Sequence, residues 1–403
     1  MSGFSLRALC AFFFVAIAGC STGGSLHALP PSAGSSAERA SVRHVCARPV
    51  AAGRRECDAV IRTDVAALTA YACGGIAAYC PRDLQAAYDV AQAAQTRGAG
   101  VTVAIVDAFG YPTAAGDLAT YRSAMSLPPC TQAGGCLQIV NQNGNAQPLP
   151  GYNWLDDWRY EEALDLDMVS ALCPNCRIVL VQANSNGIAD LDAAENTAIA
   201  LGAQVVSNSF GGPEFAASDA AFDHPGHAIV ASAGDSGAEA EQPCSFATVV
   251  CVGGTQLQRS SDIRGWGETA WGGTGSGCSR LVRKPAWQTD RGCPRRSESD
   301  ISAEASPLTP VAVYITGGWV PMGGTSAAAP IVAALFALAG NASSIDAPQW
   351  VWQHGGAGAF NDVVQGSNPG RFHCPRRMYY LCDAGPGYDG PTGWGTPNGL
   401  GGL

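Results

Sequence analysis

Charged residues are scarce in this chain of 403 residues. They make up 14% of the sequence, against roughly 25% in typical soluble domains. The acidic residues outnumber the basic ones, and the formal net charge is −10. Because nucleic-acid binding needs clustered positive charge, this balance argues against a nucleic-acid partner. Glycine, in contrast, is abundant, with 50 residues, and the composition is typical of a compact, loop-rich secreted protein.

The apolar run near the N-terminus, residues 8–18, is too short to span a bilayer. It follows Arg7, so residues 1–20 read as an export signal. The stretch Ile-Ala-Gly-Cys at 17–20 is similar to a bacterial lipobox, in which Cys20 would be lipidated. An ordinary signal peptide cut near Ala18 or Gly19 is the alternative. We therefore expect a lipoprotein of the outer membrane or cell surface, or a protein secreted after processing, that meets the membrane only through a lipid anchor at Cys20.

The sequence contains 16 cysteines, and 14 remain when Cys10 and Cys20 are set aside. In an exported chain an even set of cysteines indicates disulfides. Zinc binding is disfavoured because histidine is scarce and no two-pair cysteine spacing recurs. The close pairs are Cys130/Cys136, Cys173/Cys176, Cys244/Cys251, Cys278/Cys293 and Cys374/Cys382, while Cys46, Cys57, Cys73 and Cys80 form an N-terminal set whose pairing is open.

The Cys-Pro-Asn-Cys stretch at 173–176 has the spacing of a redox motif. It lies between an expected helix and an expected strand, which is the reverse of the order that such a motif needs. We therefore interpret this cysteine pair as structural.

Composition divides the chain into three parts. After the signal come a tether rich in Ser, Gly and Ala and a short cysteine-containing pro-segment, together residues 21–80, and then one large domain, residues 81–403. In this domain short β-branched runs alternate with helical segments, which predicts a mostly parallel α/β sheet with helices on both faces. The expected strands are 101–106, 178–181, 205–209, 228–233, 249–252 and 311–315, and the expected helices are 84–94, 159–172, 188–201 and 326–339.

A candidate nucleophile lies in the stretch Gly-Gly-Thr-Ser-Ala-Ala-Ala-Pro, residues 323–330. Glycines allow a sharp turn into the helix, and free N–H groups at the helix start favour negative charge beside Ser326. That environment suits a serine whose substrate oxygen becomes an oxyanion. The alternative is a Gly-Thr-Ser turn that begins an ordinary buried helix.

A serine nucleophile needs a base, and histidine is the usual one. The six histidines include none in a His-Gly-Thr helix start, which a subtilisin-type serine peptidase would need. His224 and His227 are the best candidates, but they flank Pro-Gly and are typical of a turn.

Carboxylates offer another base. Glu161 and Asp165 lie four residues apart, on one face of the expected helix 159–172. If the pair is buried, one pKa rises and the pair can accept a proton in acid; a solvated acidic face is the alternative. Asp235, in Ala-Gly-Asp-Ser-Gly after a strand, could hydrogen-bond an oxyanion when protonated, or could bond its own turn. Asp107, at another strand end, could extend the carboxyl network or cap a turn.

Together these motifs resemble the sedolisin family of serine-carboxyl peptidases, which have a subtilisin-like fold; the resemblance covers residues 81–403. It implies a nucleophile at Ser326, a general base at Glu161 with Asp165 as its partner, and an oxyanion stabiliser at Asp235. The stretch 207–213 resembles the family's cleft-lining segment, with Ser209, Gly211 and Gly212 as substrate-binding residues. The chain departs from the family pattern in two ways. The family usually carries a long pro-domain, whereas the pro-segment expected here is short, and some members have Trp at the place of Phe210.

The resemblance also implies one structural calcium ion near the C-terminus. The expected ligands are the carboxylates of Asp362 and Asp389 and the carbonyls of Val363, Gly385 and Gly387, since calcium prefers oxygen ligands in loops. Two aspartates in Gly-rich turns are the alternative.

The sequence thus predicts a monomeric, exported serine-carboxyl endopeptidase that hydrolyses peptide bonds of protein or peptide substrates at acidic pH through an acyl-enzyme on Ser326. One alternative is a lipid-anchored binding protein that has the peptidase fold without the activity. Another is a histidine-dependent serine hydrolase.

Overall fold

The computed structural model describes residues 41–47, 53–64, 78–216, 219–356, 358–369, 374 and 376–403. The predicted signal, the lipobox with Cys20 and the tether as far as residue 40 lie outside this set. Among the described residues no helix is both long and apolar enough to cross a membrane.

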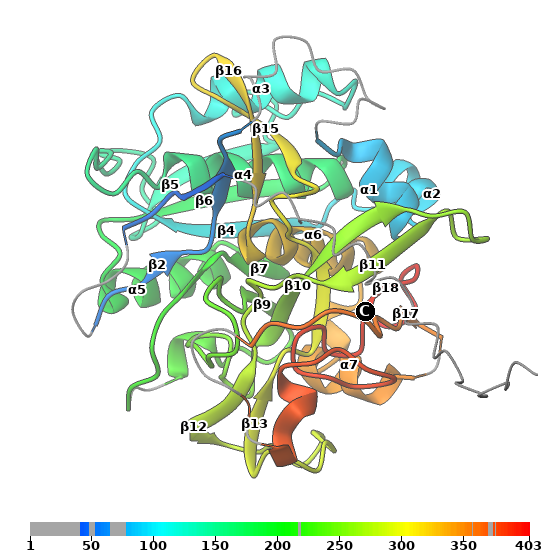
Figure 1. Ribbon diagram of the computed structural model, residues 1–403. Coiled ribbons are helices and arrows are strands. Elements are labelled where there is room, and N and C mark those ends of the chain that lie inside the picture. The colour runs from blue at the N-terminus through cyan, green and yellow to red at the C-terminus, as the bar shows by residue number, and fades with distance from the viewer. Residues whose placement is uncertain are drawn as a thin grey trace, which may run out of the picture. The chain divides into compact units, whose positions relative to one another are not determined.

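A central sheet of eight strands carries the domain (Figure 1). All of its strand pairs are parallel except β10–β11, which is antiparallel. Its inner strands read as continuous Val, Ile and Ala runs because both faces of a parallel sheet are buried. In spatial order the strands are β11 (Trp266–Ala270), β10 (Val250–Arg259), β9 (Ala228–Ser232), β7 (Val205–Asn208), β4 (Thr102–Ala108), β6 (Arg177–Ala183) and β5 (Leu137–Asn141), with β14 (Ile301–Glu304) paired to β10.

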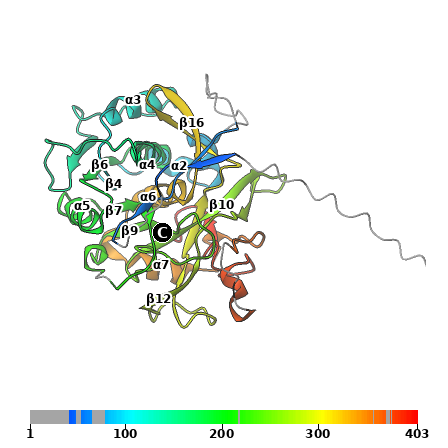
Figure 2. The same ribbon diagram turned by 60° about the vertical axis from the view of Figure 1, so that its left-hand side comes forward.

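Helices cover both faces of this sheet, as the sequence predicts. The helices α4 (Arg159–Leu172) and α6 (Thr325–Ala339) pack against each other on one face, and α5 (Ile188–Ala200) lies on the other (Figure 2). The helix α6 is buried along nearly its whole length. Its alanines let the backbone of α4 approach closely, which brings the polar face of α4 to the start of α6. Four further helices are α1 (Pro81–Ala87), α2 (Ala91–Thr96), α3 (Ala114–Ala124) and α7 (Ala347–His354).

Two expectations about individual elements are wrong. The predicted helix 84–94 is split into α1 and α2, because the chain turns at Asp89, whose φ is 54°. The predicted strand 311–315 exists as β15 (Val311–Ile315) but lies outside the parallel sheet. It forms a hairpin with β16 (Gly318–Gly323) through Thr316 and Gly317, both with positive φ. A two-residue turn of this kind favours antiparallel pairing.

The hairpin joins the N-terminal segment to the domain. The strand β3 (Val60–Arg62) pairs with β16 and with β1 (Val42–His44), and residues 40–403 form one compact unit. The remaining short elements are β2 (Glu56–Cys57), β8 (Phe210–Gly211), β12 (Gly277–Arg283), β13 (Arg295–Glu298), β17 (Phe360–Asn361), β18 (Thr396–Pro397), η1 (Ala220–Phe222), η2 (Ala342–Ser344) and η3 (Arg376–Leu381).

The domain buries many carboxyl groups, which should make its stability depend on pH. Burial raises the pKa of Glu195 in α5 to about 8 and the pKa of Glu304 in β14 well above its usual range. Such a group binds its proton more tightly in the folded than in the unfolded chain. The free energy of unfolding is then greatest at or below the ordinary carboxyl pKa, about 4, and falls as the pH rises towards 8.

We therefore expect thermal scans to give a melting temperature at least about 5 °C higher at pH 5 than at pH 8. The variant Glu195→Gln has no carboxyl proton to lose at position 195 between pH 5 and pH 8. Its melting temperature should therefore differ less between the two pH values. Asp262→Asn, an exposed turn position, should behave like the wild type. A melting temperature that is flat or rises over this range would contradict the argument.

Candidate active site

The start of α6 is the centre of the candidate site. Gly324 precedes the helix with a φ of 99°, a conformation that residues with a Cβ rarely adopt. Ser326, in the first helical turn, is fully buried. Its hydroxyl donates to the carbonyl oxygen of Ser209 at 3.3 Å. The serine is thus held at the carboxyl end of β7, the edge where parallel sheets collect active residues.

The helix α4 brings Glu161 and Asp165 to this serine. Both carboxyls are fully buried, so the interpretation as a solvated acidic face is wrong. Oδ1 of Asp165 accepts a hydrogen bond of 2.8 Å from the Ser209 hydroxyl. Burial, and next the charge of Asp165, raise the pKa of Glu161, while the nearby Ser326 hydroxyl opposes that rise. Neither Glu161 oxygen accepts a hydrogen bond of ordinary geometry, as is common for a catalytic pair before substrate is in place.

Two further carboxyls join this pair. Asp107 in β4 is fully buried, and no described residue donates a hydrogen bond to either of its oxygens, whereas Glu162 accepts a bond of 2.6 Å from the Gln182 side chain. Burial raises the pKa of Asp107, and the charges of Asp165, Glu161 and Glu162 raise it further. These carboxyls cannot all be ionised together, so the cluster holds protons above the usual carboxyl range. Sequence reasoning left the role of Asp107 open and missed Glu162, although it directly follows Glu161.

Asp235 also lies at the start of α6, where it binds the residue before Ser326. It follows β9, and its Oδ1 accepts from the backbone N–H and the hydroxyl of Thr325, at 2.8 and 2.9 Å. The Thr325 hydroxyl also accepts from the N–H of Gly234 at 3.1 Å. The turn after β9 is thereby fastened to the helix that carries the serine. The structure thus brings all four predicted catalytic residues, Ser326, Glu161, Asp165 and Asp235, to one place.

The predicted substrate-binding residues lie on and beside β8, and a segment of the chain itself is paired with them. Gly211 lies opposite Glu56 in the antiparallel pair β2–β8, and a Cβ on Gly212 would lie 3.2 Å from the Arg55 guanidinium. The N–H of Asp58 donates to the Ser209 carbonyl at 3.3 Å, and the N–H of Ser326 donates to the Asp58 carbonyl at 3.1 Å. Sequence reasoning missed Asp58, because no motif surrounds it and its position depends on long-range pairing.

The predicted calcium ligands meet at one turn. Oδ2 of Asp362 accepts from the N–H of Gly387 at 2.9 Å, and Oδ2 of Asp389 accepts from the N–H of Gly385 at 2.8 Å. Burial raises the pKa of Asp389 to about 7, and the charge of Asp362 contributes. Asp362, which Val363 follows, and Asp389, at the end of the Gly-rich turn 385–389, are thus close together, and two carboxyls with nearby backbone carbonyls are an oxygen-rich set that fits a hard cation.

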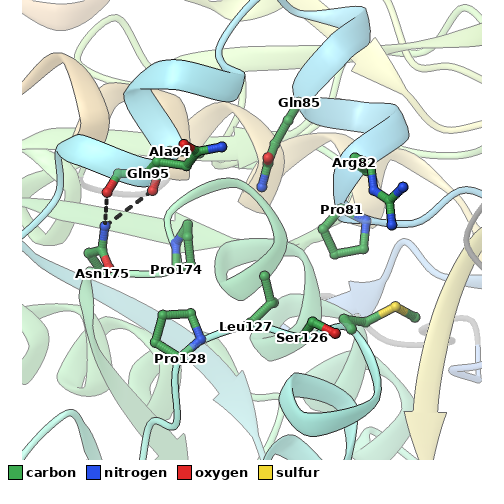
Figure 3. A pocket seen from close by; sticks show the side chains of 11 residues that line it. Pro81, Arg82, Gln85, Ala94, Gln95, Ser126, Leu127, Pro128, Pro174 and Asn175 are labelled. Atoms are coloured by element: carbon green, nitrogen blue, oxygen red, sulfur yellow. Dashed lines mark hydrogen bonds between the residues drawn. The ribbon is translucent and has the colours of Figure 1, made fainter.

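The Cys173–Cys176 turn is structural, in agreement with the sequence analysis. The Asn175 side chain donates to the carbonyls of Ala94, Gln95 and Arg97 at 3.1–3.2 Å, which caps the end of α2. Figure 3 shows this turn beside a pocket of about 350 Å³ between α1 and the Pro128 loop. No catalytic candidate lines that pocket, so it is separate from the site at Ser326.

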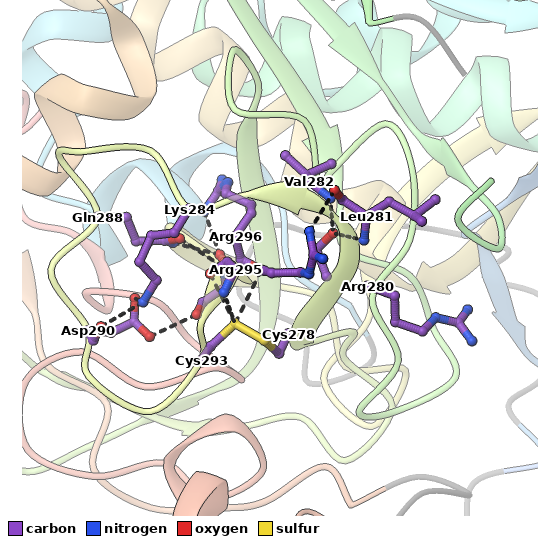
Figure 4. The surroundings of a disulfide bond; sticks show 12 residues. Cys278, Arg280, Leu281, Val282, Lys284, Gln288, Asp290, Cys293, Arg295 and Arg296 are labelled. Carbon is purple, nitrogen blue, oxygen red and sulfur yellow. Dashed lines mark hydrogen bonds and ion pairs between the residues drawn. A yellow bond between two sulfur atoms is a disulfide. The ribbon is translucent and has the colours of Figure 1, made fainter. Parts of the chain in front are cut away.

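The structure confirms all five predicted close cysteine pairs and joins Cys46 to Cys57. In Figure 4 the Cys278–Cys293 bond ties the start of β12 to the chain just before β13. Cys73 lies outside the described residues. His224 and His227 bond the backbone carbonyls of Ala221 and Ala203, which agrees with a structural role.

Comparison with known proteins agrees with this geometry. The profile of the Subtilase family matches residues 139–354, more than half of the chain. Kumamolisin from Bacillus sp. (strain MN-32) is 30% identical over an alignment of 371 residues, and the match covers 80% of this chain and 62% of that protein. Sedolisin from Pseudomonas sp. (strain 101) is 34% identical over an alignment of 173 residues, and the match covers 38% of this chain and 28% of that protein. The chain belongs to the sedolisin branch of the subtilase family.

A solved structure supports the sedolisin fold. Pseudomonas sedolisin, a serine-carboxyl proteinase complexed with two molecules of pseudo-iodotyrostatin, superposes with a TM-score of 0.68 and 25% identity, over 81% of this chain and 96% of that one. The present chain nevertheless spans less than two thirds of the length of the curated relatives it matches.

The bond from Ser209 to Asp165 can be tested directly. Ser209→Ala removes the one hydrogen-bond donor of a fully buried carboxyl. The free energy of unfolding should fall by about 1–3 kcal/mol, measured by urea denaturation. Ser344→Ala, which removes an exposed hydroxyl bonded to Asn341, should change it by less than about 0.5 kcal/mol. Equal effects of the two substitutions would mean that the Asp165 contact adds nothing to stability.

Proposed function

We propose that this chain is an exported serine-carboxyl endopeptidase that hydrolyses peptide bonds in proteins at acidic pH through an acyl-enzyme on Ser326. The single observation that carries the proposal is the convergence of Ser326, Glu161, Asp165 and Asp235 at the start of α6. Membership of the sedolisin branch supports protein or peptide substrates. Export, a lipid anchor at Cys20 and a monomeric state rest on the sequence.

The geometry supports a specific division of labour. The Ser326 hydroxyl turns from the Ser209 carbonyl towards Glu161, gives up its proton and attacks the scissile carbonyl carbon. Asp165, fixed by Ser209, holds Glu161 in place. The N–H of Ser326 and a proton on Asp235 stabilise the oxyanion. Glu161 then returns the proton to the leaving amine, and water hydrolyses the acyl-enzyme.

The buried carboxyl cluster supports an acid optimum. Each ionisation among Asp107, Glu161, Glu162 and Asp165 makes the next one harder, so the cluster keeps its protons and one accepting carboxylate at low pH. Activity that is equal in acid and in mild alkali would contradict this part of the proposal.

Substitutions test the catalytic roles. Ser326→Ala should abolish hydrolysis of an unfolded protein at acidic pH, and Asp235→Ala should lower kcat by ~10²–10³. Glu161→Gln cannot take the serine proton and should cost ~10²–10⁴. Asp262→Asn, an exposed carboxyl outside the site, serves as the matched control and should keep wild-type rates. An inactive wild type would instead favour a lipid-anchored binding protein with the peptidase fold.

We also propose that one structural calcium ion binds at Asp362 and Asp389, with the carbonyls of Val363, Gly385 and Gly387. A ligand present at 100 times its Kd stabilises a fold by about 2.7 kcal/mol. Chelation should therefore lower the melting temperature by several degrees, and added calcium should restore it. Asp362→Asn and Asp389→Asn should lose both the bound metal, measured by elemental analysis, and the response to chelator. A wild type that contains no calcium and ignores the chelator would overturn this assignment.

A further inference from the structure

We propose that the primary specificity pocket of this peptidase accepts an aspartate side chain, that the chain's own Asp58 occupies it, and that Asp58–Ala59 is the bond at which the chain cleaves itself. This inference rests on the proposed peptidase function and adds its substrate class. It comes from the placement of the segment 53–64 in the cleft, which the sequence does not indicate.

The backbone of this segment is bound as a substrate strand would be. Glu56 and Cys57 lie opposite Gly211 and Phe210 in an antiparallel pair, so an extended peptide lines the wall of the cleft. Peptide recognition by strand addition uses this kind of main-chain pairing. The next residue, Asp58, continues the pairing through its N–H to the Ser209 carbonyl.

The carbonyl group of Asp58 lies where an oxyanion would form. Its oxygen accepts from the N–H of Ser326, the nucleophile's own backbone donor, at 3.1 Å. A Cβ on Gly324 would lie 2.0 Å from this oxygen and 2.7 Å from Oδ2 of Asp235. Both proposed oxyanion stabilisers therefore surround one carbonyl of the chain, and that carbonyl belongs to Asp58.

The side chain of Asp58 fills a built pocket. It is 2% exposed, and its Oδ2 accepts from the Ser232 hydroxyl at 2.6 Å. Gly211 leaves room for the two carboxyls: a Cβ on it would lie 2.3 Å from Oε2 of Glu241 and 3.5 Å from Oδ2 of Asp58. The Glu241 carboxyl faces Asp58, and the charges of Glu56, Glu239, Asp235 and Arg55 also act on Glu241.

The Glu241 carboxyl can share a proton with an acidic side chain that enters this pocket. Burial, and next the charge of Glu241, raise the pKa of Asp58 well above its usual range, and burial with contributions from Glu56, Glu239 and Asp235 raises the pKa of Glu241 to about 8. The pair therefore keeps a proton that Glu241 can share with Asp58 instead of repelling it. Together with Ser232, Glu241 offers donors that a short carboxyl group accepts. A long or apolar side chain would leave these buried groups without partners, which is how such sites discriminate.

Contacts upstream hold the segment in register. Asn186 holds the backbone of Arg55, because its side chain donates to the Arg55 carbonyl at 2.8 Å and its backbone carbonyl accepts from the Arg55 N–H at 2.9 Å. The Arg55 guanidinium lies over the ring of Phe215, 5.1 Å from its centroid. These contacts place Asp58, and no neighbouring residue, at Ser326.

The self-cleavage step balances without any co-reactant but water. The Ser326 oxygen bonds to the Asp58 carbonyl carbon and its proton passes to Glu161. The bond from that carbon to the Ala59 nitrogen breaks, and the nitrogen takes the proton from Glu161. Water then hydrolyses the ester, which leaves a carboxyl group on Asp58, a free amine on Ala59 and the restored serine.

Such a cut would separate the N-terminal piece from the domain. Cys46 and Cys57 lie on the same side of the bond, so their disulfide does not hold the piece. The domain would keep β3 and begin at Ala59, while a lipid on Cys20 would stay with the N-terminal piece.

The test uses the full-length protein. Wild type incubated at acidic pH and then analysed by intact mass and N-terminal sequencing should yield a new terminus, Ala-Val-Ile-Arg, which Ser326→Ala does not form. Asp58→Asn, which keeps the shape, should be cut within a few-fold of the wild-type rate. Asp58→Lys and Asp58→Leu should be cut at least about tenfold more slowly. Asp64→Asn, the same change at an exposed position of the same segment, is the matched control and should be cut as wild type.

Peptides keep the test independent of how the Asp58 variants fold. The wild-type protein, after incubation at acidic pH, is given the peptide Arg-Glu-Ser-Asp-Ala-Val-Ile, which copies residues 55–61 with Ser in place of Cys57. Counterpart peptides carry Asn, Leu or Lys in place of Asp. We expect the Asp and Asn peptides to be cut after that residue at least about tenfold faster than the others. Ser326-dependent hydrolysis of an unfolded protein, with cuts elsewhere in the chain or preference for Leu or Lys, would overturn this inference and leave the proposed function standing. Loss of all Ser326-dependent hydrolysis would overturn the proposed function itself.

Discussion

The close approach of α4 and α6 is the constraint on which the site depends. The alanines of α6 leave room for α4 to bring two consecutive acidic residues and a third one turn later into a dry interface. Burying a carboxylate there without a partner is costly, so each group either keeps its proton or finds a donor. Asp165 finds the Ser209 hydroxyl and Glu162 finds Gln182, while Glu161 is left facing the serine. Glu161 is thus the carboxyl of α4 that the packing leaves facing Ser326 without a strong hydrogen bond.

Local sequence patterns were enough to predict five strands of the eight-stranded sheet and the two helices that carry Glu161, Asp165 and Ser326. The strands β4, β6, β7 and β9 are continuous β-branched runs between helical segments, and α4 begins and ends where its pattern does. Gly324, two residues before Ser326, has the positive φ that the start of α6 requires. These features depend on neighbours in the sequence, which is why a single chain reveals them.

The features that were missed depend on pairing between distant segments. The strand β15 looks like the others, but a two-residue turn at Thr316 folds it onto β16 and out of the parallel sheet. Asp58 has no surrounding motif, and only the pairing of β2 with β8 shows where it lies. The role of Glu241, too, can be inferred only from its position beside Asp58. The order of the catalytic motifs could therefore be read from the sequence, whereas the contents of the cleft could not.

The N-terminal segment also bears on how access to the candidate nucleophile could be controlled. Here β1 and β3 extend the β15–β16 hairpin, and the residues between them reach the nucleophile. The strand β3 follows Asp58 in the chain, so it would stay with the domain after a cut. Part of the strand pairing that positions the segment therefore lies on the domain side of the bond. The residues around Asp58 are held on one side by the pairing of β3 with β16 and on the other by the Asn186 contacts to Arg55, so a cut after Asp58 would leave the N-terminal piece bound to the domain through the non-covalent pairing of β1 and β2.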